Sequence, residues 1–294
     1  MKARHCISVM CYCDSEKNPD RFLRLKESIS SMKSLKNDNN YIFLWDNGSS
    51  SDVKEFIKTC DFFDDIFFSK KNLMNNAPLT LLSMKAKEME AEFVTCLCDD
   101  SLVYDAEAIP HCFEFLRSNP DVGYVRVLKY EFDRRHVYDK ILKHPEMDVP
   151  NAVRHFDYIG DQPLTWELGG FSNKYRFLKN NWHWTEFPNV CRADVFDKIV
   201  PKTDCGIMMN FESLMMKNYH NLGVKTGVLD GGAITHNQRD YHQGGSVRAS
   251  AYKSNDLHTT ILKYDELMKA DEAYKADPFY FRDQGYLIIT PKSK

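Results

Sequence analysis

The stretch FVTCLCDD, Phe93 to Asp100, decides how this sequence folds. The run from Phe93 to Leu97 has the length and apolar character of a buried strand, and it stops at Cys98 with two adjacent aspartates. Neighbouring carboxylates repel each other unless something positive lies between them. A hard divalent cation that also holds phosphate oxygens would be such a partner. The alternative is that both aspartates cap a helix predicted after Asp105.

Strands and helices alternate on the N-terminal side of this stretch. The pattern predicts strands at 7–13, 41–45, 66–68 and 93–97, and helices at 20–32, 53–60 and 78–89. Such alternation indicates a parallel sheet with right-handed crossovers, in which ligands bind beyond the carboxyl ends of the strands. Three predicted strands end at acidic or amide side chains, namely Asp14, Asp46-Asn47 and Asp99-Asp100. We expect this edge of the sheet to be the binding site.

The C-terminal side is less regular. The pattern predicts strands at 122–132 and 224–229 and helices at 211–222 and 257–276. A segment rich in Trp, Asn and Gly, 166–188, suits a binding surface. We find no internal repeat and no low-complexity linker.

Composition limits the class of protein. With 294 residues, 43% hydrophobic and 28% charged, the chain is long enough for one large α/β domain or two small ones. A formal charge of -3 gives no basic field for nucleic acid. No apolar run has the length of a membrane span, and Met1 to Met10 does not resemble a signal peptide, so a cytoplasmic location is expected.

The nine cysteines are an odd number and lie mostly in apolar runs. This usage favours buried thiols in a reducing compartment over a disulfide framework. No pair has zinc-knuckle spacing, so a metal role for the cysteines, Cys98 included, is disfavoured.

Two strings resemble family 2 glycosyltransferases. FLWDNGSSSD, Phe43 to Asp52, is similar to their "vDNgSsD" signature, and FVTCLCDD resembles the strand that carries their DxD motif. The resemblance implies a GT-A fold, which is a Rossmann-like, mostly parallel nucleotide-binding sheet with helices on both faces. Residues 1–125 would be the nucleotide-sugar-binding half, 126–254 the acceptor-binding and catalytic half of the same domain, and 255–294 a C-terminal helical extension.

The same resemblance implies roles for the acidic edge. Asp46, with Asn47 beside it, would contact the base, Asp99 the ribose, and Asp100 the metal on the diphosphate. Cys98 stands where the family has the first aspartate of DxD. The alternative for Asp46-Asn47 is a turn that closes the second strand and caps the next helix.

The second half shows a looser likeness. NVCRADVF, Asn189 to Phe196, resembles the family's "liRRevF" stretch, and NFESLM, Asn210 to Met215, resembles its "EDvDL" helix start. Glu212 would then be the catalytic base, because Ser213 replaces the second acid. His236 matches the late histidine that closes the metal site. A first-turn glutamate favoured by the helix dipole and a surface-loop histidine are the alternatives.

Two further groups complete the predicted site. Arg239, with His242 and Arg248, lies in a Gly-rich stretch that would fold over a diphosphate, although plain surface charge is an equal alternative. Trp182 and Trp184, with His183 between them, would form a platform for the acceptor, or belong to the core.

The resulting hypothesis is an inverting transfer from a nucleotide-diphosphate sugar, with a UDP-sugar as the expected donor, to a glycan or other hydroxyl acceptor. Mn2+ or Mg2+ would neutralise the leaving diphosphate, and Glu212 would take the acceptor proton. A nucleotidyltransferase is disfavoured, because Cys11 to Asp20 contains no glycine. The other alternative is a non-catalytic glycan- or partner-binding module on a decayed fold, and Cys98 and Ser213 are the features in its favour. A nucleic-acid acceptor is possible but not indicated.

Overall fold

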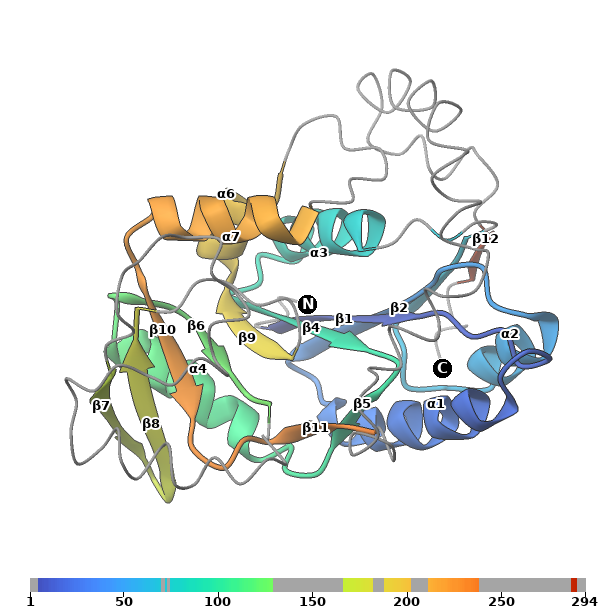
Figure 1. Ribbon diagram of the computed structural model, residues 1–294, viewed down its shortest axis with the longest axis horizontal. Coiled ribbons are helices and arrows are strands. Elements are labelled where there is room, and N and C mark those ends of the chain that lie inside the picture. Colours follow the sequence, from blue (N-terminus) through green and yellow to red (C-terminus); the bar gives the residue numbers. More distant parts are fainter. Residues whose placement is uncertain are drawn as a thin grey trace.

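Helices cover both faces of one large central sheet in the computed structural model (Figure 1). The structure describes residues 5–69, 72, 75–128, 166–181, 188–201, 211–237 and 287–289. The central sheet contains β1 (His5–Cys11), β2 (Asn40–Asp46), β3 (Asp65–Phe68), β4 (Phe93–Cys98), β6 (Val122–Arg126), β7 (Trp166–Ser172), β8 (Tyr175–Asn180), β9 (Asn189–Arg192), β10 (Lys225–Leu229) and β12 (Leu287–Ile289). A second sheet pairs β5 (Ser101–Val103) with β11 (Ile234–His236).

The strand order of the central sheet is β12-β3-β2-β1-β4-β9-β6-β10-β8-β7. Strands β3, β2, β1 and β4 are mutually parallel, as the alternation of strands and helices predicts. The short strand β9 lies antiparallel between β4 and β6, and β6 pairs in parallel with β10. The sheet is therefore largely parallel, with antiparallel strands inserted at β9 and at the edges.

The helices sort into two layers. On one face lie α1 (Pro19–Met32), α2 (Ser51–Lys58) and α4 (Ala108–Ser118), with the short 3-10 helix η1 (Lys33–Leu35) after α1; on the other lie α3 (Asn76–Glu88), α6 (Ala193–Ile199) and α7 (Phe211–Asn221) (Figure 1). Among the described residues no helix is long and apolar enough to cross a membrane.

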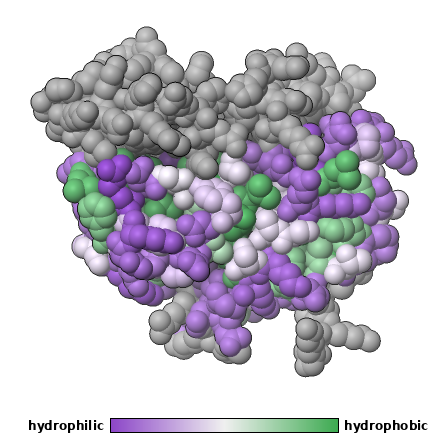
Figure 2. Space-filling view, turned by 90° about the horizontal axis from the view of Figure 1, so that it is seen from below, coloured by the Kyte–Doolittle hydropathy of each residue, from purple (hydrophilic) through white to green (hydrophobic). Residues whose placement is uncertain are grey.

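Successive residues of the central strands pack in two separate hydrophobic cores, one on each face of the sheet. Ile7 packs in the cluster on the α1 side, whereas its neighbour Cys6 packs in the cluster on the α3 side. Phe93 and Val94 divide in the same way. Strands buried on both faces read as continuous apolar runs, which explains the sequence pattern. The outer surface on the α1 side is largely hydrophilic where it is described, so the apolar stripes of these helices face inward (Figure 2).

The structure corrects two predicted strand ends. The strand predicted at 7–13 ends at Cys11, because the next two backbone N–H groups bond to side chains: Tyr12 N to Asp99 and Cys13 N to Ser49 Oγ. The strand predicted at 122–132 ends at Arg126. Its partner β9 is only four residues long, and the carbonyl of the next residue, Val127, accepts from the chain leading into β11.

Candidate active site at the carboxyl edge of the sheet

The carboxyl ends of β1, β2 and β4 lie side by side. In the parallel register Cys11 is opposite Asp46, and Met10 is opposite Cys98. The polar residues that follow these strands therefore share one edge of the sheet. This is where ligands bind in open α/β sheets, and it is the edge that the sequence predicts.

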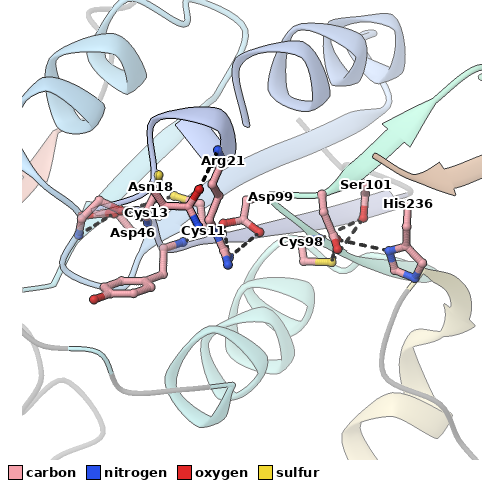
Figure 3. A network of polar contacts seen from close by, with 12 residues as sticks. Cys11, Cys13, Asn18, Arg21, Asp46, Cys98, Asp99, Ser101 and His236 are labelled. Atoms are coloured by element: carbon pink, nitrogen blue, oxygen red, sulfur yellow. Dashed lines mark hydrogen bonds and ion pairs between the residues drawn. The ribbon is translucent and has the colours of Figure 1, made fainter. Parts of the chain in front are cut away.

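Asp99 is held by an arginine from α1. Arg21 Nη2 lies 3.2 Å from Oδ1 and 2.9 Å from Oδ2 of Asp99, and Tyr12 N donates to Oδ2 at 3.1 Å (Figure 3). The Asp99 carboxylate raises the pKa of the Arg21 guanidinium, so Arg21 stays a cation. The positive partner that two adjacent carboxylates require thus comes, for Asp99, from within the chain.

Asp100 belongs to a different cluster. Its Oδ1 lies 2.8 Å from Cys98 Sγ and 3.2 Å from His236 Nδ1 (Figure 3). One ligand atom from each of these three residues can be chosen so that all lie within 4.8 Å of one another. Cations bound through bonds of about 2.0–2.3 Å keep their ligand atoms roughly 3–4 Å apart, so the donor set fits a divalent metal.

The ribbon formed by β5 and β11 brings His236 to this cluster. His236 pairs with Ser101, and Asn237 N donates to the Asp100 carbonyl at 2.6 Å. The alternative of a surface-loop histidine is wrong, because His236 ends the strand β11. The alternative that Asp99 and Asp100 cap a helix is also wrong, since β5 follows them and α4 begins only at Ala108.

Asp46 performs the turn role in this structure. Its carboxylate is fully buried and accepts from Ser49 N at 3.1 and 3.2 Å, with Cys11 Sγ at 3.7 Å. Gly48, at φ 85°, supplies the left-handed position that the turn needs. Asn47 Oδ1 accepts from Trp45 Nε1 at 2.9 Å. Contact of Asp46 or Asn47 with a base stays a prediction.

Serine side chains fasten the loop after β1 to the loop after β2. Ser15 Oγ donates to Asp52 at 2.6 Å, and Ser50 Oγ donates to the same oxygen at 2.8 Å. Cys13 N donates to Ser49 Oγ at 2.9 Å. Asp14, the third predicted acidic end, faces outward and pairs with Lys17 at 2.9 Å. Hydrogen bonds therefore join the loop after β1 to the loop after β2, next to Asp99.

Sequence reasoning missed Arg21 and Cys98. Arg21 lies in the first turn of α1, after the Asn18 cap, where the helix dipole disfavours a cation. Such a placement is a readable sign that the arginine has a carboxylate partner. Spacing and alternation along a strand disfavour a metal role for Cys98, yet the end of β4 places its Sγ beside Asp100, and the β5–β11 ribbon adds the distant His236.

Several predicted residues lie outside this description. Trp182, Trp184 and Arg239 fall outside the described residues, as do His183, His242 and Arg248. Glu212 lies in α7, so the prediction of a helix there is confirmed. Its side chain is outside the description, and its role stays a prediction.

No protein-family model matches the chain, and no curated protein matches it. Solved structures do. A mannosyltransferase, PcManGT from Pyrobaculum calidifontis in complex with GDP-Man and Mn2+, matches 96% of this chain and 73% of its own with 12% identity and a TM-score of 0.52. The chain has a GT-A fold. A fragment of S. aureus TarS, residues 1–349 in complex with UDP-GlcNAc, matches with 13% identity and a TM-score of 0.45, over 83% of this chain and 61% of that one.

Proposed function

We propose that this protein is a glycosyltransferase that transfers a sugar from a nucleotide-diphosphate donor to an acceptor hydroxyl, with inversion at the anomeric carbon. The observation that carries the proposal is the cluster of Cys98, Asp100 and His236 beside the Arg21–Asp99 pair, at the carboxyl edge of a GT-A sheet. The PcManGT structure, with a nucleotide sugar and Mn2+, supports the same assignment by analogy of fold.

The donor would lie across the ends of β1, β2 and β4. Asp46 and Asn47 contact the base, Asp99 the ribose, and Arg239 the diphosphate. A divalent cation, Mn2+ or Mg2+, held by Asp100 and His236, would neutralise the charge that develops on the leaving diphosphate. Burial raises the pKa of Asp99 above its usual value, and Arg21 opposes this shift. The same arginine fixes the carboxylate, so that its oxygens would accept hydrogen bonds from ribose hydroxyls.

The acceptor would approach from the C-terminal half, residues 126–254. Trp182 and Trp184 would offer flat apolar rings to a glycan, and Glu212 would remove the proton from the attacking hydroxyl. A place at the start of the helix, as the sequence predicts for Glu212, would favour the ionised carboxylate that a general base requires. A single displacement of this kind inverts the anomeric centre.

A thermal-shift screen of nucleotide sugars, with and without Mn2+, tests the proposal first. A ligand that binds the native state raises its stability, by about 2.7 kcal/mol at a concentration 100 times Kd. We expect one nucleotide sugar to raise the melting temperature more with Mn2+ than without it. Transfer to a panel of glycan acceptors is then followed with that donor. Stabilisation without turnover would point to the non-catalytic module, and pyrophosphate release from a nucleoside triphosphate would point to a nucleotidyltransferase.

A further inference from the structure

The third member of the metal cluster is a thiol. Cys98 is the last residue of β4, and its Sγ lies 2.8 Å from Asp100 Oδ1 and 3.4 Å from Ser101 Oγ. The backbone N–H of Cys98 donates to Ser101 Oγ at 3.1 Å, which closes a tight turn around Asp99 and Asp100. The thiol therefore contacts the Asp100 carboxylate, and Figure 3 shows Cys98 between Asp99 and His236.

His236 supplies an independent observation. Its Nδ1 is buried and forms no hydrogen bond within the described part of the chain, although Asp100 Oδ1 lies only 3.2 Å away. A buried polar atom without a hydrogen bond is rare in native proteins and calls for an explanation, and an ion bound between His236 Nδ1 and Asp100 Oδ1 is one that fits this geometry. Strand pairing holds Cys98 opposite Met10 and His236 opposite Ser101. Asp100, in the turn after β4, is held by its backbone carbonyl, which accepts from Asn237 N.

We propose that Cys98 is a metal ligand and that the site is a Cys-Asp-His centre which binds Mn2+, Co2+ or Zn2+ and selects against Mg2+. Mg2+ prefers an octahedral shell of oxygens, whereas thiolate and imidazole suit softer ions. Three protein ligands leave a position for a donor phosphate, as in catalytic metal sites. The inference rests on the metal centre of the proposed function, but it concerns the identity of the ligands and not the reaction.

Co2+ alone is the probe that reports sulfur ligation. Cobalt bound to a thiolate shows a sulfur-to-metal charge-transfer band in the near ultraviolet, which oxygen and nitrogen ligands do not produce. We expect the wild-type protein and the Cys60→Ser variant to show the band. Cys60 is the matched control, because its half-buried thiol donates to the Phe56 carbonyl, away from the cluster. The Cys98→Ser variant should lose the band.

Calorimetry with Zn2+, Mn2+ and Mg2+ measures the selectivity. Loss of a group that only hydrogen-bonds to a metal ligand commonly costs on the order of 10- to 100-fold in metal affinity, and loss of a direct ligand should cost at least as much. We expect Cys98→Ser to lose at least that much affinity for Zn2+, and Cys98→Asp to lower the ratio of Zn2+ to Mg2+ affinity by a similar factor. Because Cys98→Asp restores an all-carboxylate pair, its Mg2+ affinity should rise above that of the wild type.

The outcomes separate this inference from the proposed function. A wild-type protein that binds Co2+ without the charge-transfer band would overturn the role of Cys98, even if sugar transfer is observed. Retention of the band in Cys98→Ser would overturn it as well, and would direct attention to another thiol. A band that depends on Cys98 in a protein without transferase activity would support the metal centre and refute the proposed reaction.

Discussion

Arg21 and Asp99 form an ion pair in which one guanidinium nitrogen contacts both carboxylate oxygens, at 3.2 and 2.9 Å. The pair joins the first turn of α1 to the residue that follows β4, and both side chains are largely buried. Because of this pair, the two adjacent aspartates have different partners. Asp99 is positioned by an internal cation, and Asp100 faces the histidine and the thiol.

Arg21→Met should destabilise the protein by about 3–5 kcal/mol, because it leaves the Asp99 charge buried without its partner. The double variant Arg21→Met/Asp99→Asn should recover much of this loss, since it removes the uncompensated charge. Urea denaturation of the four proteins of the cycle measures the coupling. Lys33→Met, which removes an exposed partner of Asp61, is the control and should change little. Additive effects of the two substitutions would show that the pair is not coupled.

Asp100→Ala should abolish turnover and Mn2+-dependent donor binding while the fold stays intact. The reason is that Asp100 is the carboxylate shared by Cys98 and His236. Donor binding is measured by calorimetry with and without Mn2+, and folding by circular dichroism. Asp61→Ala, an exposed aspartate on the surface, serves as the control. Activity near the wild-type level in the presence of a chelator would refute the metal assignment.

Asp46→Ala should weaken binding of the free nucleoside diphosphate by about tenfold or more, because a hydrogen bond to a charged group contributes roughly 1.5–3 kcal/mol. Asp46→Ala also removes the hydrogen bond that Ser49 N donates within the turn, so a second variant is needed to separate the two effects. Asp46→Asn keeps an acceptor for Ser49 N and removes the charge. If both variants lose affinity, the carboxylate contacts the base. If only the alanine variant does, Asp46 acts through the turn.

Glu212→Gln should reduce the rate of sugar transfer by roughly 10²–10⁴-fold, because it preserves shape and removes the general base. Donor affinity should be nearly unchanged, since the residue is expected to face the acceptor. Glu88→Gln, at the exposed end of α3, is the control. A collapse of donor affinity would make Glu212 a donor-site or structural residue. If transfer survives, NMR of the anomeric configuration decides between another base and a retaining mechanism.

The buried His5 should make the protein less stable in acid. Burial lowers the pKa of His5 from 6.5 to about 3, and its Nε2 lies 2.8 Å from Thr95 Oγ1. The unfolded chain therefore binds a proton below pH 6.5 that the folded chain does not. The free energy of unfolding falls by about 1.4 kcal/mol per pH unit from there down to about pH 3. Urea denaturation of the wild type and His5→Gln between pH 7.5 and pH 5, values chosen to span roughly the onset of this loss, should show a shallower decline in the variant.

The parallel half of the fold could be predicted because its buried strands are short apolar runs and its helices have apolar residues at helical spacing. The run from Phe93 to Leu97 is apolar at every position but Thr95, and β4 is indeed buried on both faces. The insertion of β9 between β4 and β6 could not be predicted, because a four-residue strand carries no register information of its own. Its position is set by pairing with Phe93 to Cys96 on one side.

The site was predictable in part. A carboxylate pair after a buried strand points to a cation, and the structure brings Asp100 together with His236. That these two residues bind a metal stays a prediction. The roles of Arg21 and Cys98 depend on contacts between segments that are far apart in the chain, and spacing within one segment does not show them. Asp46 illustrates the reverse case, since a motif that suggests a ligand contact also satisfies a local turn.

The pairing of β5 with β11 has a consequence for folding kinetics. Val103 is opposite Ile234 and Ser101 is opposite His236, so the strands β6 to β10 all lie in the loop of chain that this ribbon closes. The entropy lost in closing such a loop must be offset before the contact forms, and contacts of this range slow folding. A chain that has folded only as far as β4 holds Cys98 and Asp100 but not the histidine. Cobalt spectra recorded during refolding would therefore mark the pairing of β11 with β5, later than the fluorescence change that accompanies burial of Trp45 in β2.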